Sequence, residues 1–117
     1  MNDETYKCGF NLFIYYESTG PQEIETTHLS PTTYKHIKRD HCIDDPCSFI
    51  EDTLLDPWAI VEDKTKKDRW IYHRDYEYGL YKVVVACIVD KKIKTAFISD
   101  EVKGGNVKWI QKGPLNK

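Results

Sequence analysis

An uninterrupted apolar run at 83–89, VVVACIV, constrains the fold of this 117-residue chain more than any other segment. A strand on the surface of a sheet alternates polar and apolar residues, and this run does not alternate. It is typical of a strand that is covered on both faces for part of its length. We therefore expect a central strand with neighbours on both sides.

Two short helices are predicted ahead of that strand. Ser30 can cap free backbone N–H groups, and Pro31 fits the first position of a helix. Tyr34, Ile37 and His41 then recur at helical spacing, which predicts one inward stripe with the lysines facing outward.

A second helix is expected within 43–57, with Asp45 as its cap, Pro46 as its first residue and Pro57 as its stop. The positions expected to face the core are Phe49, Ile50, Thr53 and Leu54.

After Pro57 the apolar period changes from 3.6 to 2, which indicates strands. Strands are expected at 10–17, 58–63, 68–76, 80–90 and 93–100, with a loop and a short terminal strand in 103–112. Consecutive strands joined by short turns favour antiparallel pairing. The predicted class is α+β, with an N-terminal strand and two short helices packed on a mostly antiparallel four- to five-stranded meander sheet. Residues 1–30 are expected to form an N-terminal strand and loop extension of a core at 31–117, within a single compact domain.

Sequence features bearing on location favour the cytoplasm. No segment approaches the roughly 20 apolar residues that span a bilayer, so no membrane partner is expected. The acidic start MNDE differs from the basic start of a signal peptide. We therefore expect the four cysteines, at positions 8, 42, 47 and 87, to be reduced thiols.

Charge is distributed unevenly between the two halves of the sequence. Residues 1–63 carry four Lys and Arg against 13 Asp and Glu, and residues 64–117 carry 13 against six. The asymmetry fits a basic surface for a polyanion or an acidic partner. Charge complementarity within one domain would produce the same pattern, and the sequence leaves both interpretations open.

Metal and cofactor chemistry has no sequence signature here. His36, His41, Cys42 and Cys47 lie near one another in sequence, but there is no CxxC pair and no second ligand pair at a zinc spacing. Phosphate-binding glycine motifs are also missing. We expect neither a metal nor a cofactor.

A set of polar residues remains that suits RNA cleavage without a metal. The set comprises His36, His41, His73, Arg74, Thr95 and Lys103. The 2′-hydroxyl must lose a proton and the leaving 5′-oxygen must gain one, and imidazole titrates near neutral pH. Cationic and hydroxyl donors could stabilise the charge on the phosphorane. Tyr72, Tyr76 and Tyr78 could stack on unpaired bases. Each residue also has an ordinary structural explanation, as a core histidine, a solvated side chain or a strand former.

Three segments resemble a known family when they are taken together. HIKRDH at 36–41, IEDTLLDPWAIVED at 50–63 and YKVVVACIVDKKIKTAF at 81–97 follow the pattern of the barnase–EndoU–colicin–RelE-like (BECR) fold, especially its phage-associated nucleases. The resemblance spans about 36–109. It implies a metal-independent RNA endonuclease, often directed at tRNA, encoded by a phage or mobile element and toxin-like. A cognate antitoxin, immunity protein or host protein is then an expected partner.

The resemblance also implies roles for individual residues. His41 would be the general base or acid, and His36 a second proton-transfer or orienting group. Arg74, Thr95 and Lys103 would stabilise the phosphorane. Substrate-binding positions are expected at Lys38, Arg39, Tyr72 and Tyr76.

One departure from the family pattern favours an alternative function. Asp40 stands directly before the second histidine, where the family often has a basic residue. The alternative is a catalytically inactive phage or mobile-element protein that binds a host protein or nucleic acid.

Overall fold

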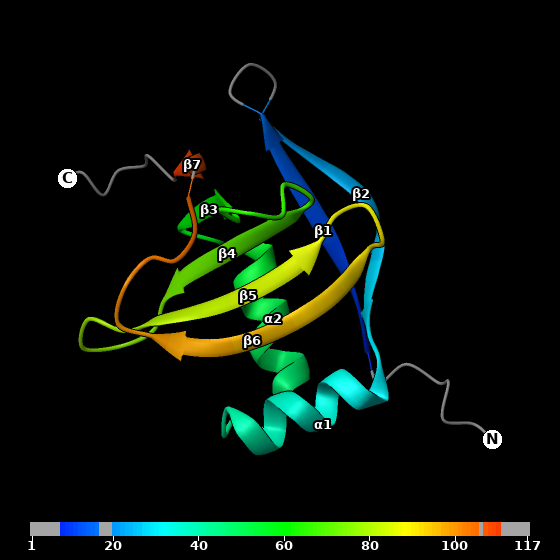
Figure 1. The fold of residues 1–117 in the computed structure, drawn as a ribbon, viewed down its shortest axis with the longest axis vertical. Coiled ribbons are helices and arrows are strands. Elements are labelled where there is room, and N and C mark those ends of the chain that lie inside the picture. Colours follow the sequence, from blue (N-terminus) through cyan, green and yellow to red (C-terminus); the bar gives the residue numbers. More distant parts are fainter. Residues whose placement is uncertain (1–7, 17–19, 106, 111–117) are drawn as a thin grey trace.

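The computed structural model describes residues 8–16, 20–105 and 107–110, with side chains described for 29–105 and 107. Its elements, in chain order, are β1 (Cys8–Tyr16), β2 (Gly20–Leu29), α1 (Pro31–Asp40), α2 (Pro46–Leu55), β3 (Ala59–Glu62), β4 (Arg69–Asp75), β5 (Tyr81–Cys87), β6 (Lys92–Ser99) and β7 (Val107–Ile110). Figure 1 shows two helices beside one twisted sheet.

The sheet has seven strands in the order β1-β2-β6-β5-β4-β3-β7. Strands β3 to β6 form the expected antiparallel meander, and the α+β class is confirmed. Strand β2 runs parallel to β6 and meets it through the pair His28–Lys92. The first and last strands of the order, β1 and β7, also contact each other, so the sheet curls back on itself.

Helix α1 begins where the sequence predicts. The Ser30 side chain accepts the backbone N–H of Thr33 at 3.2 Å, and Pro31 follows as the first helical residue. Ile37 has no exposed surface, Tyr34 is half-buried and the lysines are exposed. The helix packs on β6, with its C-terminal residue Asp40 followed directly by His41.

Helix α2 lies against the sheet and contacts β1, β4 and β5 (Figure 1). Asp45 caps it by accepting the backbone N–H of Ser48 at 3.3 Å, and Pro46 is its first residue. Its buried side chains are Pro46, Phe49, Ile50, Thr53 and Leu54, which include all four predicted core positions. They pack with the helix-facing residues of the sheet, among them Ile60, Trp70, Tyr72, Val84, Ala86 and Ala96.

Strand β5 is central, as its apolar run predicts. It lies between β4 and β6, and both Val83 and Val84 are fully buried although they point to opposite faces. The 100–105 segment, which joins β6 to β7, covers the second face near β3 and β4. A Cβ at Gly104 would lie 2.7 Å from Val61 Cγ1 and 3.1 Å from Ile71 Cδ1, so only glycine fits this approach.

Residues 20–29 were not predicted as a strand, yet they form β2 and pair with β1 along their length. The sequence GPQEIETTHL begins with Gly and Pro and has few apolar residues. Backbone N–H and C=O groups of β2 pair with those of β1, and this pairing stabilises the extended conformation whatever the side chains are.

The expectation of reduced thiols is wrong for Cys47, which is disulfide-bonded, whereas Cys42 and Cys87 are free. Persistent disulfides are rare in the cytosol, so one ground for expecting a cytoplasmic location is removed. Within the described part of the chain, no helix is long and apolar enough to cross a membrane.

Candidate functional site

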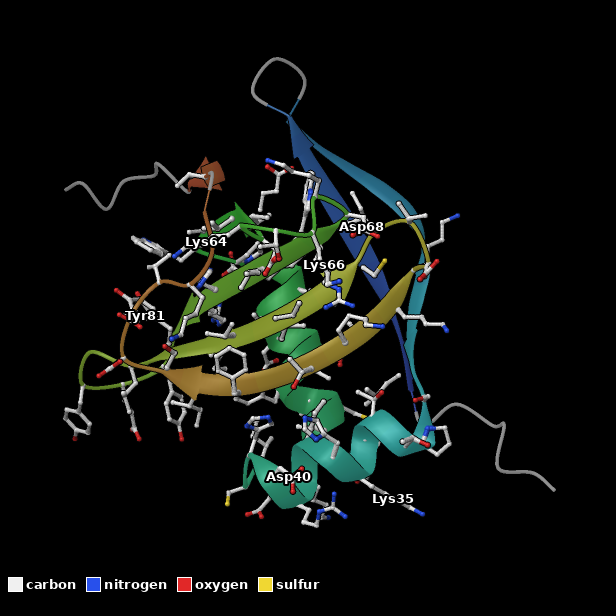
Figure 2. The ribbon with its side chains drawn as sticks, viewed as in Figure 1. Lys35, Asp40, Lys64, Lys66, Asp68 and Tyr81 are labelled. Atoms are coloured by element: carbon white, nitrogen blue, oxygen red, sulfur yellow. The ribbon has the colours of Figure 1, made fainter. Side chains whose placement is uncertain are left out.

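Two imidazoles meet at the C-terminal end of α1. The ring centroids of His36 and His41 are 4.9 Å apart, with the rings nearly perpendicular at 84°. Asp40, labelled in Figure 2, lies between them in sequence and holds one of the two rings. His36 Nδ1 donates to Asp40 Oδ2 at 2.9 Å, so Nε2 is the nitrogen that remains available on His36.

The Asp40 carboxylate also binds a cation. Arg39 Nε donates to Asp40 Oδ1 at 2.9 Å, and Arg39 Nη2 lies 3.5 Å from Oδ2. The hydrogen bond from Arg39, followed by that from His36, holds the pKa of Asp40 below its usual value, so this carboxylate is ionised at neutral pH. Asp40 therefore joins an imidazole and a guanidinium in one half-exposed cluster.

Asp40 is the residue that sequence reasoning undervalued. As a departure from the family pattern it favours an inactive protein, whereas the structure shows it holding His36. The signal was available, because residues four apart on a helix are neighbours and a His–Asp pair at this spacing can form a hydrogen bond.

Strand β6 approaches this cluster with Phe97 and Thr95. The His41 and Phe97 rings are 5.7 Å apart between centroids. Thr95 lies two residues before Phe97 and therefore on the same face of β6. Its Oγ1 is shielded from solvent and has no hydrogen-bond partner among the described residues. Thr95 thus does not present its hydroxyl to a ligand.

Arg74 is held elsewhere, at the end of α2. Its Nη1 donates to both the backbone oxygen and Oδ2 of Asp56, each at 2.8 Å. Strand pairing places Arg74 opposite Lys82, which in turn faces Ile98 on β6. Ile98 and Thr95 are three residues apart on that strand, so Arg74 and Thr95 point to opposite faces of the sheet. The structure does not bring Arg74 to Thr95.

Lys103 has a structural role in the segment that crosses the sheet. Its backbone N–H donates to Nε2 of His73 at 2.9 Å, and its Nζ donates to Glu101 at 2.9 Å. This ammonium group lowers the pKa of Glu101. Both polar groups of Lys103 are engaged away from the α1 cluster.

The three tyrosines expected to stack on bases do not form one surface. Tyr72 is fully buried in the core against α2 and cannot contact a substrate in this structure, which corrects its assignment to substrate binding. Tyr76 is 45% exposed, and Tyr78 is 95% exposed in the turn between β4 and β5. The centroid of the Tyr76 ring lies 5.8 Å from Lys82 Nζ, which forms an ion pair with Asp52 of α2.

Two surface hollows adjoin the α1 cluster. One is lined by Tyr34, Lys35, Lys38 and Arg39 on α1 itself, with Lys38 Nζ 5.9 Å from the Tyr34 ring. The other is acidic, and its lining includes Cys42, Asp44, Asp45, Phe49, Asp52, Tyr76 and Lys82. A phosphate group is attracted to the first hollow and repelled by the second.

Among the described residues, no three His, Cys, Asp or Glu side chains form a group that could hold a metal ion. In the comparisons with known proteins, no family model, no curated protein and no solved structure matches this chain. The case for a function therefore depends on the geometry of the cluster.

Proposed function

We propose that this chain is a metal-independent RNA endonuclease that acts through the imidazole pair of α1. The observation that carries the proposal is the contact between His36 and His41, with His36 oriented by Asp40. Cleavage of RNA through its 2′-hydroxyl requires one group that accepts a proton and one that donates a proton. Two adjacent imidazoles can supply both near neutral pH.

The hydrogen bond to Asp40 supports a division of roles between the two imidazoles. Because His36 donates from Nδ1, its neutral form carries a lone pair on Nε2 and can accept the proton of the 2′-hydroxyl. The 2′-oxygen then attacks phosphorus and the bond to the 5′-oxygen breaks. Protonated His41 donates to that leaving oxygen, which yields a 2′,3′-cyclic phosphate and a free 5′-hydroxyl.

Cations on the same helix are suited to the phosphate. Arg39 is fixed beside His36 through their shared carboxylate, and Lys38 is exposed one residue before it. Donors held in place before the reaction stabilise the extra charge that builds on the phosphorane oxygens. In this proposal Lys38 and Arg39 replace Arg74 and Lys103, which the sequence resemblance assigned to that role.

The test is cleavage of total tRNA and of a single-stranded RNA by purified protein in EDTA. We expect cleavage by the wild type and a loss of at least about a hundredfold in His41→Ala and in His36→Ala, because general acid and base catalysis each contribute about 10²–10⁴-fold. Cys42→Ser is the matched control, since it changes an exposed side chain next to His41. Cleavage that survives in His41→Ala would reject these roles.

A second candidate is a non-catalytic protein that binds nucleic acid or a host protein. It is favoured by Arg74 and Lys103, whose charges are neutralised by Asp56 and Glu101 rather than directed at the imidazoles. RNA binding without cleavage in the same assay would select it.

A toxin-like role would add a cognate antitoxin or immunity protein, detectable by co-purification from the source cell. A cytoplasmic location would follow from the RNA substrate, but the disulfide at Cys47 argues for an oxidising compartment.

A further inference from the structure

Two turns that carry lysines lie together at the end of the meander where β6 begins. The 63–68 turn joins β3 to β4, and the 88–91 turn joins β5 to β6. Arg69 pairs with Cys87, and Ile88 N–H donates to the Asp68 backbone oxygen at 2.9 Å. The two turns, together with Lys92 directly after the second one, are therefore one connected surface, which we call the lysine turns.

Two of the three carboxylates in these turns are directed inward, and the third, that of Asp90, is exposed. Asp63 Oδ2 accepts the backbone N–H groups of Thr65 and Lys66 at 3.1 and 3.0 Å, and these bonds lower its pKa. Asp68 Oδ2 accepts the thiol of Cys87 at 3.4 Å. Both carboxylates are used to shape the turns rather than to neutralise lysines.

Several lysines of this surface are exposed. Lys66 and Lys92 form no ion pair with another described residue. Lys67 lies 3.6 Å from Glu62, and the charge of Lys64 lowers the pKa of Glu101. Figure 2 shows Lys64, Lys66 and Asp68 around the 63–68 turn, far in that view from Lys35 and Asp40 on α1. The lysine turns are thus a second cationic surface, distinct from that of α1.

The opposite end of the meander has the opposite charge. Asp75 and Glu77 lie in the turn between β4 and β5, and Asp100 follows β6. Arg74 and Lys82, near this end, are paired with the carboxylates of Asp56 and Asp52. A polyanion is therefore attracted to the lysine turns and repelled from the β4–β5 turn.

We infer that the lysine turns bind the phosphate backbone of a single-stranded RNA whose reacting phosphate lies at His36 and His41. The choice of RNA as the polyanion rests on the proposed function. Strand β6 connects the two places, since it starts at Lys92 in the lysine turns and reaches the imidazoles at Phe97. That path is about 17 Å long, at about 3.3 Å per residue, so a strand of several nucleotides is needed to contact both.

The experiment measures binding of a fluorescein-labelled 20-nucleotide oligouridine to full-length His41→Ala protein, between 50 and 200 mM NaCl. We expect the added double change K66Q/K92Q to weaken binding about tenfold or more at 100 mM NaCl. It should also reduce the slope of log K against log salt by about 1.4, since each contact of a cation with a single strand contributes about 0.7. The matched control K82Q/K103Q removes the same charge from two ion-paired lysines, and we expect binding within about twofold of the parent protein.

Equal weakening by the two double variants would overturn the inference, because only net charge would then matter. No change in K66Q/K92Q, or no binding by the parent protein at 50 mM NaCl, would overturn it as well. Cleavage assays with the wild type separate this result from the proposed function. If the wild type cleaves no RNA, but K66Q/K92Q loses RNA binding and K82Q/K103Q does not, the inference that the lysine turns bind RNA is supported and the catalytic proposal is rejected. If RNA is cleaved and K66Q/K92Q binds RNA as the parent protein does, the catalytic proposal is supported and the proposed binding by the lysine turns is rejected.

Discussion

His73 is an imidazole with no exposed surface, held beneath the 100–105 segment. Its Nε2 accepts the backbone N–H of Lys103, so the proton of the neutral ring is on Nδ1, which has no hydrogen-bond partner among the described residues. Burial lowers the pKa of His73, and the backbone of Ala59 and Ile71 opposes this only in part. Protonation would remove the acceptor and place a charge in the core.

This environment predicts a loss of stability in mild acid. The unfolded chain binds a proton at His73 near pH 6.5, whereas the folded chain does so only at lower pH. The stabilising contribution of the neutral ring is complete above about pH 6.5 and is lost as the pH falls below that value. The slope should approach about 1.4 kcal/mol per pH unit for this one proton. Urea unfolding at several pH values would measure it, and an NMR titration should show the His73 ring taking up its proton at a lower pH in the folded than in the unfolded chain. A flat unfolding free energy across this window would contradict the prediction.

At the scale of elements, α1 is the part that carries the proposed chemistry. Its start and its inward face were readable in the sequence, because the Ser30–Pro31 start and the Ile37 stripe follow from local hydrogen bonding and helical spacing. Strand β5 was readable for a similar reason, since its apolar residues do not alternate with polar ones. Strand β2 was not, because its extended state depends on pairing with β1.

Loss of the Ser30 cap should destabilise α1. Ser30→Ala removes the acceptor for the Thr33 N–H and should lower the free energy of unfolding by about 1 kcal/mol. Thr32→Ala, at an exposed position in the first turn, is the control and should be neutral or slightly stabilising. Chemical denaturation of both variants would measure the difference. Equal stability of the two would show that this cap is not used in solution.

At the scale of the whole molecule, long-range pairing decided which expected site residues could meet. Arg74 donates a hydrogen bond to Asp56 at the end of α2. The backbone N–H of Lys103 donates to His73 on β4. Neither partner is near in sequence, so no local pattern could reveal it. Tyr72 was expected at a surface because tyrosines recur along its strand. The helix-facing side that includes it is buried by α2 instead.

The Cys47 disulfide also acts on the whole chain, because a cross-link restricts the unfolded ensemble. Cys47→Ser should lower the free energy of unfolding by about 2–4 kcal/mol, and reduction of the wild type should do the same. Cys42→Ser changes an exposed free thiol and should stay within about 0.5 kcal/mol of wild type. Urea denaturation with and without reductant provides the measurement. No response to reductant would mean that the bond does not persist in solution.

The contact of β2 with β6 at the pair His28–Lys92 has a consequence for how the chain folds. Neighbouring strands of the β1–β2 hairpin and of the β3–β6 meander are joined by short connections. His28 and Lys92, by contrast, are far apart in the chain. Loop closure of that length is slow compared with hairpin formation. We therefore expect the meander and its helices to form the folding nucleus, with φ-values well above zero in β4 and β5 and near zero in β1 and β2. The N-terminal hairpin would dock last, so mutations there should mainly accelerate unfolding and leave the folding rate unchanged.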